Sequence, residues 1–342
     1  MPSGYKGGRG VSKEMKKEPI LKVEHLKMYF PLTKGFMKKT GGVVKAVDDI
    51  SFSVEKGKTL GIVGESGCGK TTTGKCILQI NKPTEGKILY EGQDLITMDR
   101  SRLKDCRRDI QMIFQDPFGS LDPRQKAFSI IREVLVEEDD YHGADEVKNK
   151  VNELLVKVGL SEEMGERYPH EMSGGQRQRL GIARALACDP KIIICDEPVS
   201  ALDVSIQAQI INLFKELQRE MGLTYIFVAH DLAVVRHIAD VIAVMYLGRI
   251  MEMMEAVELY KNPMHPYSQA LLSAIPIVDY YEEQKRERIL LKGEVPSPIH
   301  APSGCPFHPR CPYASEKCRT APPELKDLGN GHYVACYHVD KN

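Results

Sequence analysis

One short segment constrains the fold of this chain more than any other, namely GESGCGKT at residues 64–71. It satisfies the pattern G-x-x-x-x-G-K-[ST] and lies between the apolar run TLGIVG, typical of a strand, and TTGKCILQI, typical of a helix. In that context the glycines let successive backbone N–H groups converge on phosphate oxygens, and the helix N-terminus adds a favourable dipole. Lys70 can then reach the β- and γ-phosphates, and Thr71 can ligate Mg²⁺. The segment predicts a strand, a loop and a helix that together bind a nucleotide.

Hydrophobic patterns on both sides extend this unit into a fold class. The segments LKVEHLKMYF and VVKAVDDISFSV alternate apolar and polar residues as half-buried strands do, and KILYEGQDL predicts a further strand. Later in the chain, KIIICDE, LTYIFVAH and DVIAVMYLG predict apolar strands separated by helices. Residues of about 116–184 repeat apolar side chains at helical spacing. We expect an α/β fold, with a mostly parallel sheet, an antiparallel β part and a helical insertion subdomain.

Composition divides the chain into three regions. Residues 1–18 are rich in Gly and Lys and lack periodicity, so we expect a flexible tail. Residues 19–256 carry the α/β pattern and are expected to form one nucleotide-binding domain. Residues 257–342 form what we call the C-terminal extension, which is expected to be mostly loop because eight prolines fall between Pro296 and Pro323.

Composition also limits where the chain is expected to work. The 47 basic and 47 acidic residues cancel, so the net charge gives no indication of a nucleic-acid partner or an anionic membrane surface. Apolar runs such as residues 241–247 are shorter than the roughly 20 residues that a bilayer span needs, and the N-terminus lacks the apolar core of a secretory signal. Nine cysteines, an odd number, fit a reducing compartment without structural disulfides. We therefore expect the cytosol.

Two adjacent acids end the segment KIIICDEP. Asp196 and Glu197 are expected at the carboxyl end of a buried strand, where sheets of this kind bind ligands. Asp196 suits the holding of Mg²⁺ through its water shell, while Glu197 is placed to polarise a water for attack on a γ-phosphate. A structural helix cap is the alternative interpretation of these acids. Cys68, at the start of the first helix, is either an activated thiol or simply a small residue.

The segment MSGGQ, at residues 172–176, opens the helix QRQRLGIARALA with Ser173 placed as its N-cap. With Gln115 in MIFQDP, Asp203 in SALD and His230 in LTYIFVAH, it occurs in the order found in ATP-binding-cassette ATPases. Residues of about 20–255 resemble that family, which implies a RecA-like P-loop fold. Met172 stands where the family's signature usually begins with Leu, a substitution that conserves volume.

This resemblance implies a head-to-tail dimer in which ATP is held between the P-loop of one chain and the SGGQ segment of the other. It assigns Gln115 to the sensing of Mg²⁺ and the attacking water, His230 to the γ-phosphate, and Asp203 to the coupling of the two sites. Phe30, with Tyr29 as the alternative, falls where the family stacks an aromatic ring on adenine. The residues expected to bind ATP are Phe30, Gly64, Glu65, Ser66, Gly67, Cys68, Gly69, Lys70, Thr71, Thr72, Ser173, Gly174, Gly175, Gln176 and Asp203. Those expected to bind Mg²⁺ are Thr71, Gln115 and Asp196.

Flanking segments narrow the resemblance. YPHEMSGGQRQRLGIARAL, VAHDLAVVRHIAD and NPMHPYSQALLSAIP are similar to the ATP-binding subunits of bacterial and archaeal oligopeptide/dipeptide importers, in the peptide/nickel branch, and MIFQDPFGSLDPR resembles their F-type subunit. Such a subunit is peripheral on the cytoplasmic face of the cell membrane. It binds two permease subunits and a paralogous ATPase or a second copy of itself, and it is served indirectly by an extracytoplasmic peptide-binding protein. Residues 115–121, and Phe118 in particular, are then expected to contact a permease.

Other functions remain open at this point. A nickel, glutathione or oligosaccharide importer would share the same tail, because substrate choice lies in other subunits. A soluble cassette ATPase acting on DNA or ribosomes would usually carry a long coiled coil or two cassettes, and the sequence shows neither. A redox-sensing nucleotide-binding protein would explain the cysteines, but it would have no use for Glu197 and His230.

Four cysteines in the C-terminal extension form the last notable pattern. Cys305, Cys311 and Cys318 in GCPFHPRCPYASEKC, and Cys336 in HYVACYH, are separated by five, six and seventeen residues. Four converging thiolates usually bind metal, and these spacings suit a [4Fe–4S] cubane better than the paired knuckles of a zinc site. Related importer ATPases carry such a cluster here, so the resemblance implies one as well, with a structural role in holding the extension against the ATPase core. Zinc, free thiols and a disulfide are the alternatives. Three histidines could substitute for a thiolate, namely His308, His332 and His338.

Overall fold

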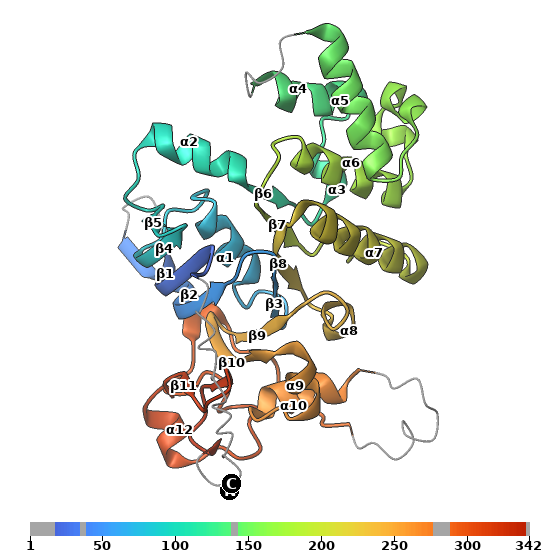
Figure 1. Ribbon diagram of the computed structural model, residues 1–342. Helices are drawn as coiled ribbons and strands as arrows, with labels where there is room; N and C mark the ends of the chain where they lie inside the picture. The colour runs from blue at the N-terminus through green and yellow to red at the C-terminus, as the bar shows by residue number, and fades with distance from the viewer. Residues whose placement is uncertain (1–17, 35–38, 138–142, 276–287, 340–342) are drawn as a thin grey trace, which may run out of the picture.

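The computed structural model describes residues 18–34, 39–137, 143–275 and 288–339, so the predicted tail at residues 1–18 lies outside it except for its last residue. An eight-stranded sheet runs through the molecule in the order β11-β12-β10-β9-β3-β8-β7-β6, and a four-stranded sheet in the order β2-β1-β4-β5 lies beside it (Figure 1). The strands are β1 (Leu21–Lys34), β2 (Lys39–Val54), β3 (Thr59–Val63), β4 (Glu85–Tyr90), β5 (Gln93–Asp94), β6 (Ile110–Ile113), β7 (Ile192–Asp196), β8 (Thr224–Ala229), β9 (Val241–Tyr246), β10 (Arg249–Glu255), β11 (Lys326–Asp327) and β12 (Tyr333–Val334).

Helices lie on both sides of the large sheet and at its two ends (Figure 1). They are α1 (Lys70–Ile77), α2 (Arg100–Asp109), α3 (Pro117–Ser120), α4 (Ala127–Glu137), α5 (Ala144–Lys157), α6 (Gly174–Leu186), α7 (Val204–Met221), α8 (Leu232–Val235), α9 (Ala256–Lys261), α10 (Pro266–Ser273) and α12 (Glu316–Thr320). Short 3₁₀ turns are η1 (Glu162–Glu166), η2 (Pro169–Glu171) and η3 (Pro298–His300). Among the described residues, no helix combines the length and the apolar character that a bilayer crossing requires.

The centre of the large sheet is parallel and buried. β3 pairs in parallel with β8 and β9, and β7 pairs in parallel with β6 and β8. Every residue of β3, β7 and β8 is buried, which explains why these strands are apolar runs without alternation. Because parallel strands end at the same edge, the loops that follow them meet there. The predicted α/β class is confirmed.

The small sheet is antiparallel throughout, as the alternating segments predicted. KILYEGQDL, however, is not the single strand that we expected. It forms two strands, β4 and β5, joined by a turn at Glu91 and Gly92, with φ values of 45° and 78°. Two consecutive positive φ values are the geometry of a tight hairpin turn, for which a residue followed by Gly is suited.

Helices α3 to α6 fill the predicted insertion at 116–184 and pack at one end of the molecule, shown in green in Figure 1. Helix α2, in contrast, has no sequence pattern that predicts it. None of its residues is buried, so it lacks an apolar stripe. It begins at Asp99, whose carboxylate accepts hydrogen bonds from the N–H groups of Ser101 and Arg102.

The C-terminal extension joins the ATPase sheet directly. β12 pairs antiparallel with the edge strand β10, and β11 pairs with β12. Tyr267, Cys305 and Phe307 belong to the same buried apolar cluster as residues of β7 and β8. Helices α9, α10 and α12 surround this junction (Figure 1). The extension therefore shares a core with residues 19–256, and the boundary at 256/257 stays a prediction from composition.

Candidate active site

The loop between β3 and α1 requires glycine at two positions. Gly64 and Gly69 have φ values of +155° and +107°, a region in which other residues are strained. A Cβ atom on Gly64 would lie 2.1 Å from the carbonyl oxygen of Met245, and one on Gly69 would lie 2.1 Å from that of Ala46. The loop is thus packed tightly against β9 and β2, and a larger residue would displace it.

Lys70 lies inside this loop. Its side chain is 4% exposed, and its Nζ donates hydrogen bonds to the carbonyl oxygens of Gly64, at 2.8 Å, and Glu65, at 3.2 Å. Phosphate oxygens can replace these two acceptors. Cys68 lies two residues before Lys70 in the same loop. It is buried, and burial raises the pKa of its thiol. This supports the interpretation of Cys68 as a small residue, since an activated thiol has a lowered pKa.

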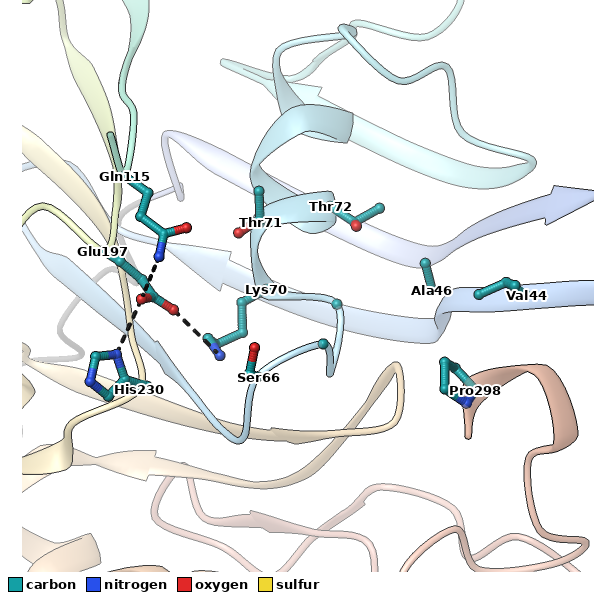
Figure 2. Close-up of a pocket in the computed structure, with 12 residues that line it drawn as sticks. Val44, Ala46, Ser66, Lys70, Thr71, Thr72, Gln115, Glu197, His230 and Pro298 are labelled. Carbon is teal, nitrogen blue, oxygen red and sulfur yellow. Dashed lines mark hydrogen bonds and ion pairs between the residues drawn. The ribbon is translucent and has the colours of Figure 1, made fainter. Parts of the chain in front are cut away.

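Glu197 is the centre of the polar contacts in Figure 2. Its backbone has a φ of 46°, a strained value for a residue other than glycine, and its N–H donates to the carbonyl of Val228 at 2.9 Å. One carboxylate oxygen accepts a hydrogen bond from Gln115 Nε2 at 3.2 Å and lies 3.1 Å from His230 Nδ1. The other lies 3.9 Å from Lys70 Nζ. Residues from three separate segments therefore converge on the Glu197 carboxylate.

Asp196 faces Thr71 instead. The Thr71 hydroxyl donates to Asp196 Oδ1 at 2.7 Å, and the Asp196 carboxylate is buried. Burial raises the pKa of Asp196; the Thr71 hydrogen bond opposes this rise, and the Glu197 carboxylate adds to it. A divalent cation beside these oxygens would lower the pKa of Asp196 instead, because it stabilises the ionised carboxylate. The donor set of Thr71 and Asp196, with the Gln115 amide oxygen nearby in the cleft, fits Mg²⁺ chemically.

A cleft of about 350 Å³ lies beside Glu197. The residues lining it are Val44, Ala46, Ser66, Gly67, Gly69, Lys70, Thr71, Thr72, Gln115, Glu197, His230 and Pro298. No sequence pattern predicted that Val44, Ala46 or Pro298 would line the cleft. Pro298 comes from the C-terminal extension and faces the two β2 residues across the end of the cleft opposite Glu197 (Figure 2). No local pattern places a residue of the extension here.

The two aromatic candidates for adenine stacking differ in their surroundings. Phe30 is 37% exposed and pairs across the strands with Val44, so both side chains lie on the same face of the sheet as the cleft wall. Tyr29 is engaged elsewhere, because its hydroxyl donates to the Asp48 carboxylate and Lys45 lies over its ring. This difference favours Phe30.

The signature segment lies apart from the cleft of its own chain. Ser173 caps α6: its Oγ accepts from Gln176 N–H at 3.3 Å, while Gln176 Oε1 accepts from Ser173 N–H at 2.9 Å. Gly175 lies against Ile206, which a Cβ would approach to 2.7 Å. Asp203 is exposed at the start of α7. Among the described residues that line the cleft, none comes from residues 172–176 or 203, so one chain presents only half of the predicted site.

The four predicted cluster cysteines gather in one place. Cys305 and Cys318 are buried, and Cys305 N–H donates to the Cys318 carbonyl at 2.8 Å. Burial raises the pKa of Cys305 to about 11, and the charges of Cys318, Cys311 and Cys336 add to it. No disulfide joins any two of these four. In the described part of the chain, no three His, Cys, Asp or Glu side chains converge closely enough to hold a single metal ion.

Fold and cleft together define an ATP-binding cassette ATPase. A family profile described as "ABC transporter" matches residues 47–200, and one described as "Oligopeptide/dipeptide transporter, C-terminal region" matches residues 251–318. The dimeric structure of the cassette MJ0796 in a post-hydrolysis state bound to ADP and Pi is similar, with a TM-score of 0.62 and 28% identity over 69% of this chain and 98% of that one.

Curated relatives narrow the class. The oligopeptide transport ATP-binding protein AppF of Bacillus subtilis (strain 168) is 55% identical over 94% of this chain and 97% of its own length. The dipeptide transport ATP-binding protein DppF of Escherichia coli (strain K12) is 48% identical over 95% of this chain and 96% of its own. The chain belongs to this family of oligopeptide and dipeptide transport ATP-binding proteins.

Proposed function

We propose that this chain hydrolyses ATP to energise the import of oligopeptides or dipeptides through a membrane transporter. The observation that carries the proposal is the convergence of Gln115, His230 and Lys70 on the Glu197 carboxylate at the end of β7. The names of its relatives support a peptide as the substrate, because both parts of the chain, the cassette and the extension, match them along almost their full length.

The chemistry follows from these contacts. The loop N–H groups and Lys70 hold the β- and γ-phosphates, after Lys70 exchanges the Gly64 and Glu65 carbonyls for phosphate oxygens. Glu197 orients a water and receives its proton while the water oxygen bonds to the γ-phosphorus and the bond to the β-phosphate oxygen breaks. Mg²⁺, when bound, neutralises charge on the transferring phosphoryl group. Thr71 and Asp196 would hold it, with Gln115.

Gln115 and His230 keep the Glu197 carboxylate in place. Each contributes a nitrogen within about hydrogen-bond reach of the same oxygen, so the other oxygen is left to face Lys70 and the incoming phosphate. His230 is more than half exposed, which leaves it able to turn toward a γ-phosphate. Both residues therefore act on catalysis by positioning.

The second half of the site comes from another chain in this proposal. Ser173, Gly174, Gly175 and Gln176 begin a helix at the surface, and a helix N-terminus favours bound phosphate. Asp203 is exposed and would link the two sites. A head-to-tail dimer, with a paralogous ATPase or a second copy of this chain, brings the segment over the cleft. The similar cassette MJ0796 is dimeric, which supports a dimer here.

The transporter also requires membrane partners. We propose a peripheral position on the cytoplasmic face, bound to two permease subunits, with an extracytoplasmic peptide-binding protein on the other side. Gln115, Asp116 and Gly119 are exposed beside the catalytic cleft, so a permease helix resting there would sense its closure. The side chain of Phe118, the residue predicted to make this contact, lies outside the described residues.

The test of the transport function is uptake. A strain lacking this chain should lose uptake of labelled dipeptides and oligopeptides, and the wild-type chain should restore it while Lys70→Ala should not. Loss of nickel or glutathione uptake with unchanged peptide uptake would contradict the proposed substrate.

For the four cysteines we propose a [4Fe–4S] cluster. The charges of Cys311, Cys318 and Cys336 act on the Cys305 thiol, so four thiols lie near one another, which is the number of ligands that such a cluster takes. Among the histidines, His332 is engaged with Glu252 at 2.7 Å, whereas His338 Nε2 lies 3.8 Å from Cys318 Sγ. His308 Nδ1 lies 2.9 Å from the Cys305 carbonyl.

Iron content tests this proposal. Anaerobically purified protein should contain about four irons per chain, bound by four thiolates. Cys305→Ser and Cys318→Ser should each lower that number, while Cys106→Ser, a change outside the extension, should not. One zinc per chain without iron would contradict the cluster, and intact iron in both extension variants would contradict the ligands.

A further inference from the structure

We infer that Arg310 and Tyr267, both in the C-terminal extension, position the phosphate-binding loop through Glu65. This inference rests on the proposed function, because it concerns how the same cleft binds ATP. Arg310 makes a bidentate contact with the Glu65 carboxylate, with nitrogen-to-oxygen distances of 2.7 and 3.1 Å. The Glu65 N–H donates to the Tyr267 hydroxyl at 3.0 Å. The extension thus holds one loop residue by its side chain and by its backbone.

Burial makes this contact stronger than a surface ion pair. The Arg310 side chain is 8% exposed and that of Glu65 is 27% exposed. The guanidinium lies over the ring of Tyr246, which packs edge-to-face against Tyr267 and Phe307. Paired, charge-assisted hydrogen bonds fix direction as well as distance. The packed aromatic rings therefore hold Arg310 in place independently of its contact with the loop.

All polar groups of Glu65 are then engaged at once. Its carbonyl accepts from Lys70 Nζ at 3.2 Å and from Cys68 N–H at 3.3 Å, while its N–H and carboxylate are held by the extension. When ATP binds, Lys70 leaves the carbonyl for the phosphates. The contacts to Arg310 and Tyr267 do not depend on Lys70, so they can hold the loop open during that exchange and lower the entropy cost of binding.

Charge gives Arg310 a second effect. Glu65 carries a carboxylate on the loop that must accept a polyanion, and like charges at short range disfavour binding. Arg310 neutralises that carboxylate by direct contact. Removing Arg310 alone should therefore harm ATP binding more than removing both charges together. A purely structural role in holding the extension predicts no such relief.

A double-mutant cycle in ATP binding tests the inference. The probe is a fluorescent ATP analogue with Mg²⁺, titrated into the purified full chain. We expect Arg310→Gln to weaken binding roughly tenfold, as for the loss of a charged hydrogen-bonded pair. Glu65→Gln should weaken it less, and the double variant should bind several times more tightly than Arg310→Gln. Arg319→Gln, an exposed arginine of the same extension, is the matched control and should bind like wild type.

The outcomes separate this inference from the proposed function. If Lys70→Ala binds the analogue as tightly as wild type, the proposal that this cleft binds ATP is wrong. If Lys70→Ala loses binding but Arg310→Gln does not, or if the double variant binds no better than Arg310→Gln, the positioning role is wrong. If Arg310→Gln fails to fold, Arg310→Lys replaces it as the test, because lysine keeps the charge without the bidentate contact. Arg310→Lys should then bind the analogue more weakly than wild type, and wild-type affinity in this variant would contradict the role assigned to the geometry.

Discussion

Two pairs of glutamate and histidine in this molecule have similar contacts and opposite surroundings. In the cleft, Glu197 lies 3.1 Å from His230, with side chains 14% and 56% exposed. Under the extension, Glu252 lies 2.7 Å from His332, with side chains 0% and 5% exposed. Glu252 also accepts hydrogen bonds from the N–H groups of Met264 and His265. The first carboxylate keeps solvent access and a strained backbone, while the second is buried with three donors.

The surroundings of each carboxylate indicate whether it serves stability or catalysis. A fully buried carboxylate with satisfied hydrogen bonds holds its neighbours in one arrangement, here β10, the start of α10 and the segment before β12. A carboxylate at a cleft whose partners are exposed, as Gln115 and His230 are, can exchange them for a substrate. We therefore expect substitutions of Glu252 to act on folding, and substitutions of Glu197 to act on catalysis.

The largest expected effect on stability is that of Glu252→Ala. It leaves two backbone N–H groups and His332 buried without an acceptor, which should lower the free energy of unfolding by about 3–5 kcal/mol. Urea unfolding of the purified chain measures this. Glu258→Ala removes a glutamate from an exposed pair with Lys261 and should leave stability nearly unchanged. Equal effects of the two variants would contradict the comparison.

The next effect concerns pH. Burial lowers the pKa of His265 to about 3, from an ordinary value of 6.5, so the folded protein keeps this ring neutral while the unfolded chain protonates it. His265 is packed against Phe307, with the Glu252 carboxylate bound to its backbone. Stability from this residue is therefore complete above pH 6.5 and decreases as the pH falls toward 3, by about 2 kcal/mol between pH 7 and pH 5.

His265→Asn tests that pH dependence. Asn can replace the ring nitrogen that accepts from Tyr267 N–H at the start of α10, but it does not titrate. The difference in unfolding free energy between pH 7 and pH 5 should thus be about 2 kcal/mol smaller than in wild type. If the difference is the same in His265→Asn as in wild type, His265 is not the source of this pH dependence.

The smallest expected effect is that of Glu197→Gln on stability. The amide keeps an oxygen for Gln115 and relieves the repulsion of Asp196, so we expect a change within about 1 kcal/mol by urea unfolding. A loss as large as that of Glu252→Ala would show that the two pairs do not differ as proposed.

Local patterns predicted the parts of the site that are local. The loop at residues 64–71, the two acids at the end of β7 and the cap at Ser173 each follow from residue types next to one another. The contact of Arg310 with Glu65 joins residues 245 positions apart, and Pro298 reaches the cleft through the folding of the extension. No hydrophobic periodicity and no motif spacing in the sequence predicts either of these contacts. Helix α2 escaped prediction because it buries no side chain, and the turn at Glu91 because Glu before Gly is a weaker hairpin signal than Asn or Asp before Gly.

The central role in the proposed reaction belongs to Glu197, the residue expected to activate water. In the assembled transporter, Glu197→Gln should lower the rate of ATP hydrolysis by at least about 100-fold, because the group that orients the water and takes its proton is lost. ATP binding should persist, since the loop and Lys70 are unchanged, whereas Lys70→Ala should lose it. Hydrolysis by Glu197→Gln at close to the wild-type rate would contradict the central claim.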